Sequence, residues 1–183
     1  AYPDCHILLK WTREDEHCWE PYGSASINKL FGAINDEGQI VYWSNEAFSD
    51  TYLSRPSNEE LNNFTSFKFL NNDFTKIRSK PKTSAHMGIH RNLDPLYNFS
   101  KTRLVKNLVH DLPLRTSALR TLGAFANITS SESFLNDLAF AKNIDQFKIR
   151  TQHLDDERAI EVLESLENTM KSSHAKPNNY RGI

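Results

Sequence analysis

The chain has 183 residues, of which 38% are hydrophobic and 25% are charged, which is the composition of a somewhat polar globular protein. A net charge of −1, without a basic stripe or tail, argues against a nucleic-acid partner. No apolar run approaches the roughly 20 residues that a membrane-spanning helix requires. We therefore expect neither a nucleic-acid partner nor a membrane span, in a chain long enough for one domain with a sizeable core.

The N-terminal part of the chain predicts strands. Residues 6–13 alternate, with Ile7, Leu9 and Trp11 on one face, which is the pattern of a half-buried strand. The acidic and aromatic residues 14–23 that follow are expected to form a loop. We expect the strand and this loop to form the start of a sheet.

A hairpin is the next predicted element. Two segments of strand character, 25–34 and 40–48, flank the turn residues Asn35-Asp36-Glu37-Gly38, whose glycine can adopt a positive φ angle. Residues 49–82 are predicted to be a long excursion with local helix near 58–70. A further strand is expected over residues 102–110 because of its β-branched valines.

The second half of the chain predicts helices. One helix should begin after Gly123, where Ile128, Leu135, Leu138 and Ala139 form one stripe, or later, at a capping box of Thr129 and Glu132. Asp145 should cap a shorter helix, and Asp155 or Asp156 a third. A strand-rich region 1–113 followed by a helical region 121–171 predicts one α+β domain over 1–183, with a mainly antiparallel sheet and helices packed on one face.

The segment before the long helix is the strongest candidate for a binding site. Arg120 stands just before a turn that contains Gly123, and the first turn of a helix leaves N–H donors unpaired at the positive end of its dipole. A guanidinium and backbone N–H groups would together suit an oxyanion. The alternative is that Gly123 only permits a tight turn and that Arg120 pairs with a surface carboxylate.

A metal site is not predicted. Cys5-His6 and His17-Cys18 contain the side chains that ligate zinc. A strand between the two pairs, rising about 3.3 Å per residue, would hold them far apart. The two cysteines are also too few for a disulfide framework.

Several segments resemble, in the same order, the molybdopterin-binding large subunit of the xanthine oxidase family of molybdenum hydroxylases. The likeness is greatest to bacterial members that act on aldehydes or N-heterocycles, such as isoquinoline and nicotinate oxidoreductases. It leaves only about residues 50–85 without a counterpart. The segments that carry it are residues 11–16, 19–23, 36–41 with Trp43, 88–97, 114–134, 144–150 and 153–154.

The resemblance implies that this chain is an internal segment of such a subunit. The parent would be a molybdenum-dependent oxidoreductase that hydroxylates an aldehyde or N-heterocycle with water-derived oxygen, and it would pass electrons to iron–sulfur and other redox subunits. Arg120, Thr121, Leu122 and Gly123 would contact the molybdenum–pterin cofactor, and Arg120 and Leu122 would line the substrate pocket.

The sequence departs from the family at this turn and lacks other parts of its site. Thr121 stands where the family has a glycine, and Leu122 where it often has an aromatic residue. The family's glycine-rich loop, pterin-binding glutamine and catalytic glutamate have no counterpart here, so we expect no catalytic residue, no bound cofactor and no activity in the isolated chain. The alternative function is a non-catalytic binding or assembly module that meets a partner chain.

Overall fold

A computed structural model describes residues 3–51, 80–110, 112–114 and 116–173. The excursion expected over 49–82, with its local helix at 58–70, lies for the most part outside the described residues. The elements are α1 (Arg13–Trp19), β1 (Ser26–Ile34), β2 (Ile40–Ser49), the 3-10 helix η2 (Gly88–His90), β3 (Thr102–Leu108), α3 (Ala124–Lys142), α4 (Gln146–Thr151) and α5 (Glu157–Ser172).

The three described strands form one sheet in the order β1-β2-β3. β1 and β2 make the expected antiparallel hairpin, with Ser26 opposite Ser49 at its open end. At its closed end Gly38 has a φ angle of 82°, and the N–H of Asn35 donates to the carbonyl of Gln39 at 3.0 Å. The turn residues therefore predicted the hairpin correctly.

β3 pairs with β2 in parallel, with Trp43 opposite Thr102 and Ser49 opposite Leu108. Parallel neighbours require a connection that returns the chain to the same end of the sheet, and residues 50–101 provide it. The α+β class is confirmed. The sheet is mixed, with one antiparallel and one parallel pair, where a mainly antiparallel sheet was expected.

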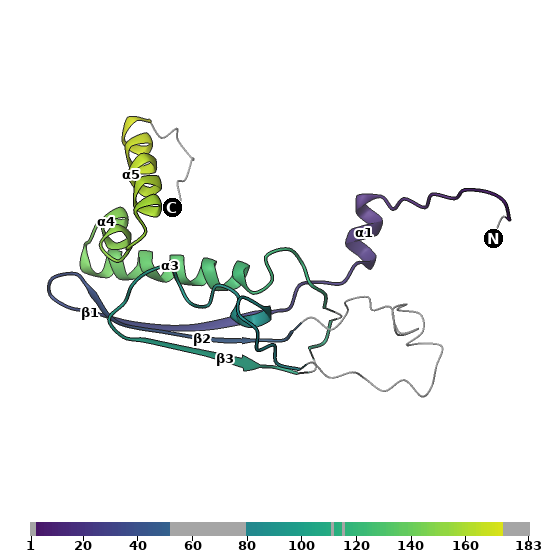
Figure 1. Cartoon of the computed structure of the whole chain (residues 1–183), viewed down its shortest axis with the longest axis horizontal. Helices are drawn as coiled ribbons and strands as arrows, with labels where there is room; N and C mark the ends of the chain where they lie inside the picture. The colour runs from purple at the N-terminus through teal and green to yellow at the C-terminus, as the bar shows by residue number, and fades with distance from the viewer. Residues whose placement is uncertain (1–2, 52–79, 111, 115, 174–183) are drawn as a thin grey trace.

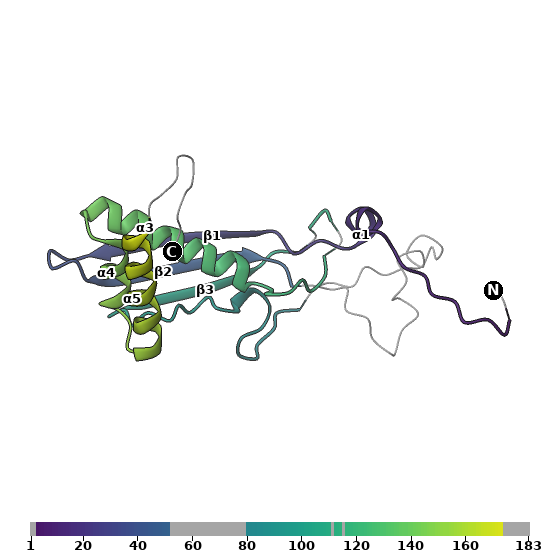
Figure 2. The same ribbon diagram turned by 90° about the horizontal axis from the view of Figure 1, so that it is seen from above.

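The core lies between the sheet and α3, which runs along one face of the sheet in both ribbon views (Figures 1 and 2). Trp43 of β2 and Leu135 of α3 are fully buried, and the ring of Trp43 stacks on Phe99 at 4.8 Å between centroids. Ala139 of α3 and Ile149 of α4 complete the same cluster. Burial of apolar surface at this interface, which stabilises the fold by about 25 cal/mol per Å², is the main force that holds α3 on the sheet.

The strand expected over residues 6–13 is wrong. The chain there is extended but unpaired within the described residues, and Leu8 and Leu9 are 90% and 81% exposed. α1 replaces the loop expected after it, because Thr12 and Asp15 form a reciprocal capping box at its N-terminus. The N-terminal segment and α1 project away from the sheet (Figure 1).

The two helices after α3 begin at the N-cap residues that the sequence predicted. Asp145 accepts from the N–H groups of Phe147 and Lys148 and begins α4, whereas Asp156, the second of the two candidates, begins α5. α3 begins directly after Gly123, so the later start at Thr129 is not used. Short acidic side chains before an apolar repeat are therefore reliable start signals in this chain.

Two apolar surfaces remain uncovered in the described part of the chain. α5 contacts α4 but buries none of its residues, and Val162 is 67% exposed. On the face of the sheet away from α3, Ile27 and Phe31 of β1 are also largely exposed. Within the described ranges, the sheet thus carries helices on one face only (Figure 1).

Candidate functional site

The predicted turn, residues 120–123, leads directly into α3. The N–H of Leu122 donates to the carbonyl of Leu119 at 3.1 Å, and the N–H of Ala124 donates to the carbonyl of Thr121 at 3.0 Å. Thr121 and Leu122 have φ angles of 80° and 54°. Residues with side chains, and β-branched ones above all, rarely adopt this left-handed backbone, so the turn is strained.

Contacts with η2 hold the turn in this conformation. The N–H of Gly123 donates to the carbonyl of Gly88 at 3.2 Å. A Cβ atom on Gly123 would lie 2.4 Å from that carbonyl oxygen and 2.7 Å from the carbonyl oxygen of Ile89. Gly123 is therefore required for the close approach of two backbone segments, which is a different reason from the tight turn that the sequence suggested.

An amide network fixes the first turn of α3 against the sheet. Asn127 is 1% exposed and donates from Nδ2 to the carbonyls of Ile89 at 2.8 Å and Arg91 at 3.0 Å. Asn28 of β1 donates to Oδ1 of Asn127 at 2.9 Å and to Oδ1 of Asn45 at 3.0 Å. Because buried amides are costly unless they are paired, this network sets the position of the helix start relative to both strands.

A pocket of about 320 Å³ lies in front of the start of α3. All four predicted residues, Arg120, Thr121, Leu122 and Gly123, line it. The open end of the hairpin forms another part of its wall, through Ser26 of β1 and Ser49 of β2. The structure therefore brings the predicted residues together with residues about 70 to 100 positions earlier in the chain.

The end of α3 at this pocket carries free donors. No side chain caps the helix, and its first turn contains no acidic residue. Within the described ranges, the N–H groups of Phe125 and Ala126 have no hydrogen-bond partner, and both residues line the pocket. A helix of 19 residues places partial positive charge at this point, which favours a bound anion.

Arg120 adds a full positive charge to the same pocket. The residue is exposed, and no ion pair joins it to any carboxylate that the structure describes. The surface salt bridge that was the alternative role for this arginine is therefore absent from the described part of the chain. The guanidinium remains available to a ligand.

Asp50 is a pocket residue that the sequence did not single out. It directly follows β2, is 6% exposed, and its Oδ1 atom is buried without a hydrogen-bond partner in the described structure. The register of the predicted hairpin was the signal in the sequence that could have identified Asp50. Because Ser26 pairs with Ser49, the polar residue after β2 had to lie at the open end of the hairpin.

A second pocket, of about 300 Å³, lies between residues 92–97, α3 and α5. Two of its polar residues are already paired: the hydroxyl of Tyr97 donates to Glu132, and the guanidinium of the buried Arg150 donates to the same carboxylate at 2.9 Å. Burial raises the pKa of Tyr97, and the nearby carboxylate of Glu132 adds to this shift. These three side chains satisfy one another and stabilise the fold, and no Arg or Lys lines this pocket.

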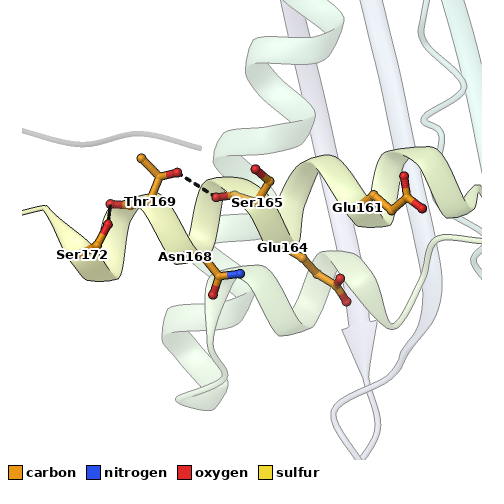
Figure 3. A pocket seen from close by; sticks show the side chains of 6 residues that line it. All are labelled: Glu161, Glu164, Ser165, Asn168, Thr169 and Ser172. Atoms are coloured by element: carbon orange, nitrogen blue, oxygen red, sulfur yellow. Dashed lines mark hydrogen bonds between the residues drawn. The ribbon is translucent and has the colours of Figure 1, made fainter.

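A shallow depression on the polar face of α5 is shown in Figure 3. Two of its hydroxyl groups donate to the helix's own backbone, Thr169 to the carbonyl of Ser165 and Ser172 to that of Thr169. The carboxylates of Glu161 and Glu164 lie along one helix with no cation among the residues that line the depression. The arrangement is that of a solvated helix face.

Neither a metal cluster nor a membrane-length apolar helix occurs in the described ranges. Both cysteines are exposed, and no three His, Cys, Asp or Glu side chains there are grouped so that they could hold a metal ion. None of the helices there is both long and apolar enough to cross a bilayer. The pocket in front of α3 is thus the one site, among those described, that combines free donors, positive charge and volume.

No known protein-family model matches the chain. The chain is similar to a subunit of the nicotinate dehydrogenase of Pseudomonas putida, with 28% identity over 172 residues. The match covers 93% of this chain but 13% of that protein. This chain is therefore similar, over nearly its whole length, to one segment of a much longer dehydrogenase subunit.

Proposed function

We propose that this chain is a segment of the molybdopterin-binding subunit of a molybdenum-dependent oxidoreductase, one that hydroxylates an aldehyde or an N-heterocycle with water-derived oxygen. The similarity to a nicotinate dehydrogenase subunit, over almost all of the chain, carries the proposal. It agrees with the resemblance of the separate sequence segments to the same family. The turn at residues 120–123 is the part of the chain that we assign to the cofactor and substrate pocket.

The residues at the pocket fit part of a molybdenum–pterin group. The N–H groups of Phe125 and Ala126, together with Arg120, suit the oxyanions of such a cofactor or of a substrate. Thr121 keeps a positive φ angle, so the backbone retains the conformation that a glycine would favour at this position. The pocket itself is at the small end of the range for cofactor sites, so other segments would have to hold the remainder.

The chain's own residues have a limited role in this proposal. Arg120 and the start of α3 bind and orient an anionic group and stabilise negative charge that develops near them. Leu122 and Phe125 border the pocket with apolar surface and limit the access of water. The molybdenum–pterin group, when bound, supplies the oxidation chemistry, and iron–sulfur and other redox subunits would receive the electrons.

The proposal also accounts for the uncovered apolar surfaces. The chain spans 13% of the length of its relative, so most of a comparable subunit would lie outside it. Ile27 and Phe31 on the open sheet face, and Leu8 and Leu9 near the N-terminus, would then pack against other segments. The isolated chain is expected to be inactive because it lacks the family's glycine-rich loop, glutamine and glutamate.

A non-catalytic binding or assembly module is the second candidate, favoured by the same exposed surfaces. In that case a separate partner chain, rather than the rest of one subunit, would cover the open face of the sheet. The two candidates differ in what the full-length protein binds. A binding module would contain no molybdenum and no pterin, whatever its partner.

Cofactor analysis of the full-length parent and of the 183-residue chain tests the proposal. We expect the parent to contain molybdenum and pterin in stoichiometric amounts and to oxidise aldehydes or N-heterocycles with an artificial electron acceptor. The isolated chain should contain neither and show no turnover. A purified, folded parent without molybdenum would contradict the assignment, and a stoichiometric cofactor or measurable turnover in the isolated chain would contradict its being only a segment of the site.

A further inference from the structure

We propose that the outer edge of β3 is a docking site for an acidic, extended segment of a separate protein chain, which adds a strand to the sheet beside β3. Two independent features of this edge carry the inference: backbone groups that are free to pair, and basic side chains that lack a counter-charge. The inference does not depend on the assignment of the pocket in front of α3.

The backbone of β3 has one unpaired side. β3 is the last strand in the order β1-β2-β3, and it forms one edge of the sheet seen from above (Figure 2). The carbonyl of Lys101 accepts from Trp43, and the N–H of Val109 donates to Ser49, each at 2.9 Å, so the odd-numbered residues of this segment face β2. Successive residues of a strand direct their N–H and C=O groups to opposite sides. The outward groups, which no third strand pairs in the described ranges, are those of Thr102, Leu104, Lys106 and Leu108.

Positive charge is concentrated in β3 and in the segment beside it. Residues 80–110 contain six lysines and arginines but one acidic residue, Asp94, whereas the whole chain has a net charge of −1. Nζ of Lys106 donates to the carbonyl of Lys82 and to Nδ1 of His90, which fixes residues 82–90 beside β3. The six basic residues, of which all but the last are exposed, are Lys80, Lys82, Arg91, Lys101, Arg103 and Lys106.

These charges select the partner. None of the six basic residues forms an ion pair with a carboxylate that the structure describes. An acidic segment would therefore be attracted to this edge, whereas a second copy of the chain would bring an equally basic β3 and be repelled, as lysines on edge strands commonly ensure. A nucleic acid would meet the basic side chains but could not pair with the free backbone groups. An acidic segment in an extended conformation satisfies both features of the edge.

Three short peptides test the inference with the 183-residue chain. Glutamate and valine alternate over eight residues in the first, lysine replaces glutamate in the second, and proline replaces valine in the third, which keeps the charge but lacks half of the N–H donors. Affinities would be measured by NMR titration. We expect the glutamate–valine peptide to bind, the glutamate–proline peptide to bind roughly tenfold more weakly or less because hydrogen bonds are lost, and the lysine peptide not to bind.

Hydrogen exchange identifies the surface that is used. The bound glutamate–valine peptide should slow exchange of the N–H groups of Leu104 and Lys106, which point outward, and should leave that of Val105, which faces β2, unchanged. The affinity should fall as the salt concentration rises, because exposed charges are screened. Unchanged exchange at Leu104 and Lys106 with the peptide bound would overturn the proposal, and so would the absence of binding.

Charge reversal supplies the matched comparison. Lys82→Glu with Lys101→Glu reverses two exposed charges at the edge and should weaken the glutamate–valine peptide by roughly tenfold or more. Lys148→Glu with Arg158→Glu makes the same change in net charge on α4 and α5 and should bind almost as the wild type does. Thermal unfolding of both variants checks that each is folded.

Three further results would contradict a strand-docking site. Equal losses of affinity in the two double variants, or equal affinities of the glutamate–valine and glutamate–proline peptides, would show attraction by charge alone. Heparin supplies the third result. If heparin displaced the peptide and bound more tightly without slowing exchange at Leu104, the edge would be a general polyanion site.

Discussion

Polar groups are paired differently at the start of α3 and in the rest of the helix. At the start of the helix, the turn at Thr121 and Leu122 is strained, the helix has no side-chain cap, and Arg120 beside it has no described ion-pair partner. Such an arrangement weakens the fold unless something else binds there. A ligand that binds to the free donors would compensate for this cost.

The middle and the C-terminal end of α3 pair their polar groups internally. Arg150 is 1% exposed and donates to Glu132 and Asn136, each at 2.9 Å, and to the carbonyl of Gln146. The helix ends at Asn143, whose φ angle of 52° lets its N–H reach the carbonyls of Ala139 and Phe140. The difference is the one expected if the start of the helix binds a ligand, as we propose, while the rest of the helix serves stability.

The largest expected effect lies in the middle of α3. Glu132→Ala removes the carboxylate that accepts from Arg150 and Tyr97, and it leaves a buried guanidinium without its counter-charge. We expect a loss of about 3 kcal/mol in the free energy of unfolding, at the low end for a broken buried pair because Glu132 is 30% exposed. Urea unfolding of the variant measures this loss.

Two further variants sharpen that result. Glu161→Ala, on the polar face of α5, removes an equal charge from an exposed site and should change stability by less than about 0.5 kcal/mol. The double variant Glu132→Leu with Arg150→Met removes both charges and should lose less than Glu132→Ala does. Equal losses from Glu132→Ala and Glu161→Ala would show that the buried pair does not stabilise the helix.

Local signals in the sequence predicted most of the fold. Asn35 and Gly38 predicted the hairpin, and Asp145 and Asp156 predicted two helix starts. These predictions succeeded because each feature depends on neighbours within a few residues. The parallel pairing of β3 depends on a connection of about 50 residues and could not be predicted locally. The strand predicted from the apolar alternation of residues 6–13 was wrong for a related reason. A strand needs a partner to pair with, and the described part of the chain offers none.

The next effect, at the start of α3, concerns activity rather than stability. In the full-length parent, Arg120→Ala should lower kcat/KM by on the order of 10² to 10³, the usual loss when one donor to developing negative charge is removed. Its melting temperature should stay within error of the wild type, since an exposed arginine contributes about 1 kcal/mol or less to folding. Steady-state kinetics and thermal unfolding of the same preparation measure both properties.

Arg158→Ala, at an exposed position in the first turn of α5, is the matched control and should keep normal kinetics. A near-normal kcat/KM in Arg120→Ala would remove this arginine from the pocket. A loss of activity that matched the loss of folded protein would have the same consequence.

The sequence predicted one wall of this pocket and missed the other. Arg120 and the start of α3 are adjacent in the chain, so composition and helix periodicity were enough to place them together. Asp50 and Ser49 reach the pocket through the pairing of β1 with β2 and the packing of α3 on the sheet. Such long-range proximity becomes visible only when the register of the hairpin and the position of the helix are both known.

The smallest expected effect tests the strain in the turn. Thr121 has a φ angle of 80°, where a β-branched residue is strained by about 1 to 3 kcal/mol and glycine is not. Thr121→Gly removes that strain but gives the unfolded chain more freedom, which costs about 0.5 to 1 kcal/mol. The two effects oppose each other, so we expect stability to stay equal or rise by about 1 kcal/mol, as measured by urea unfolding.

Thr116→Gly provides the contrast, because Thr116 is buried and lies outside the residues with positive φ angles. Glycine gains nothing there and loses packing, so that variant should be less stable than the wild type. In the full-length parent, Thr121→Gly should leave kcat/KM unchanged or raise it, since the backbone conformation of the turn is already the one that glycine favours. If Thr121→Gly destabilised the chain as much as Thr116→Gly, the left-handed turn would not be strained, and the contrast between the start of α3 and the rest of the helix would lose its main support.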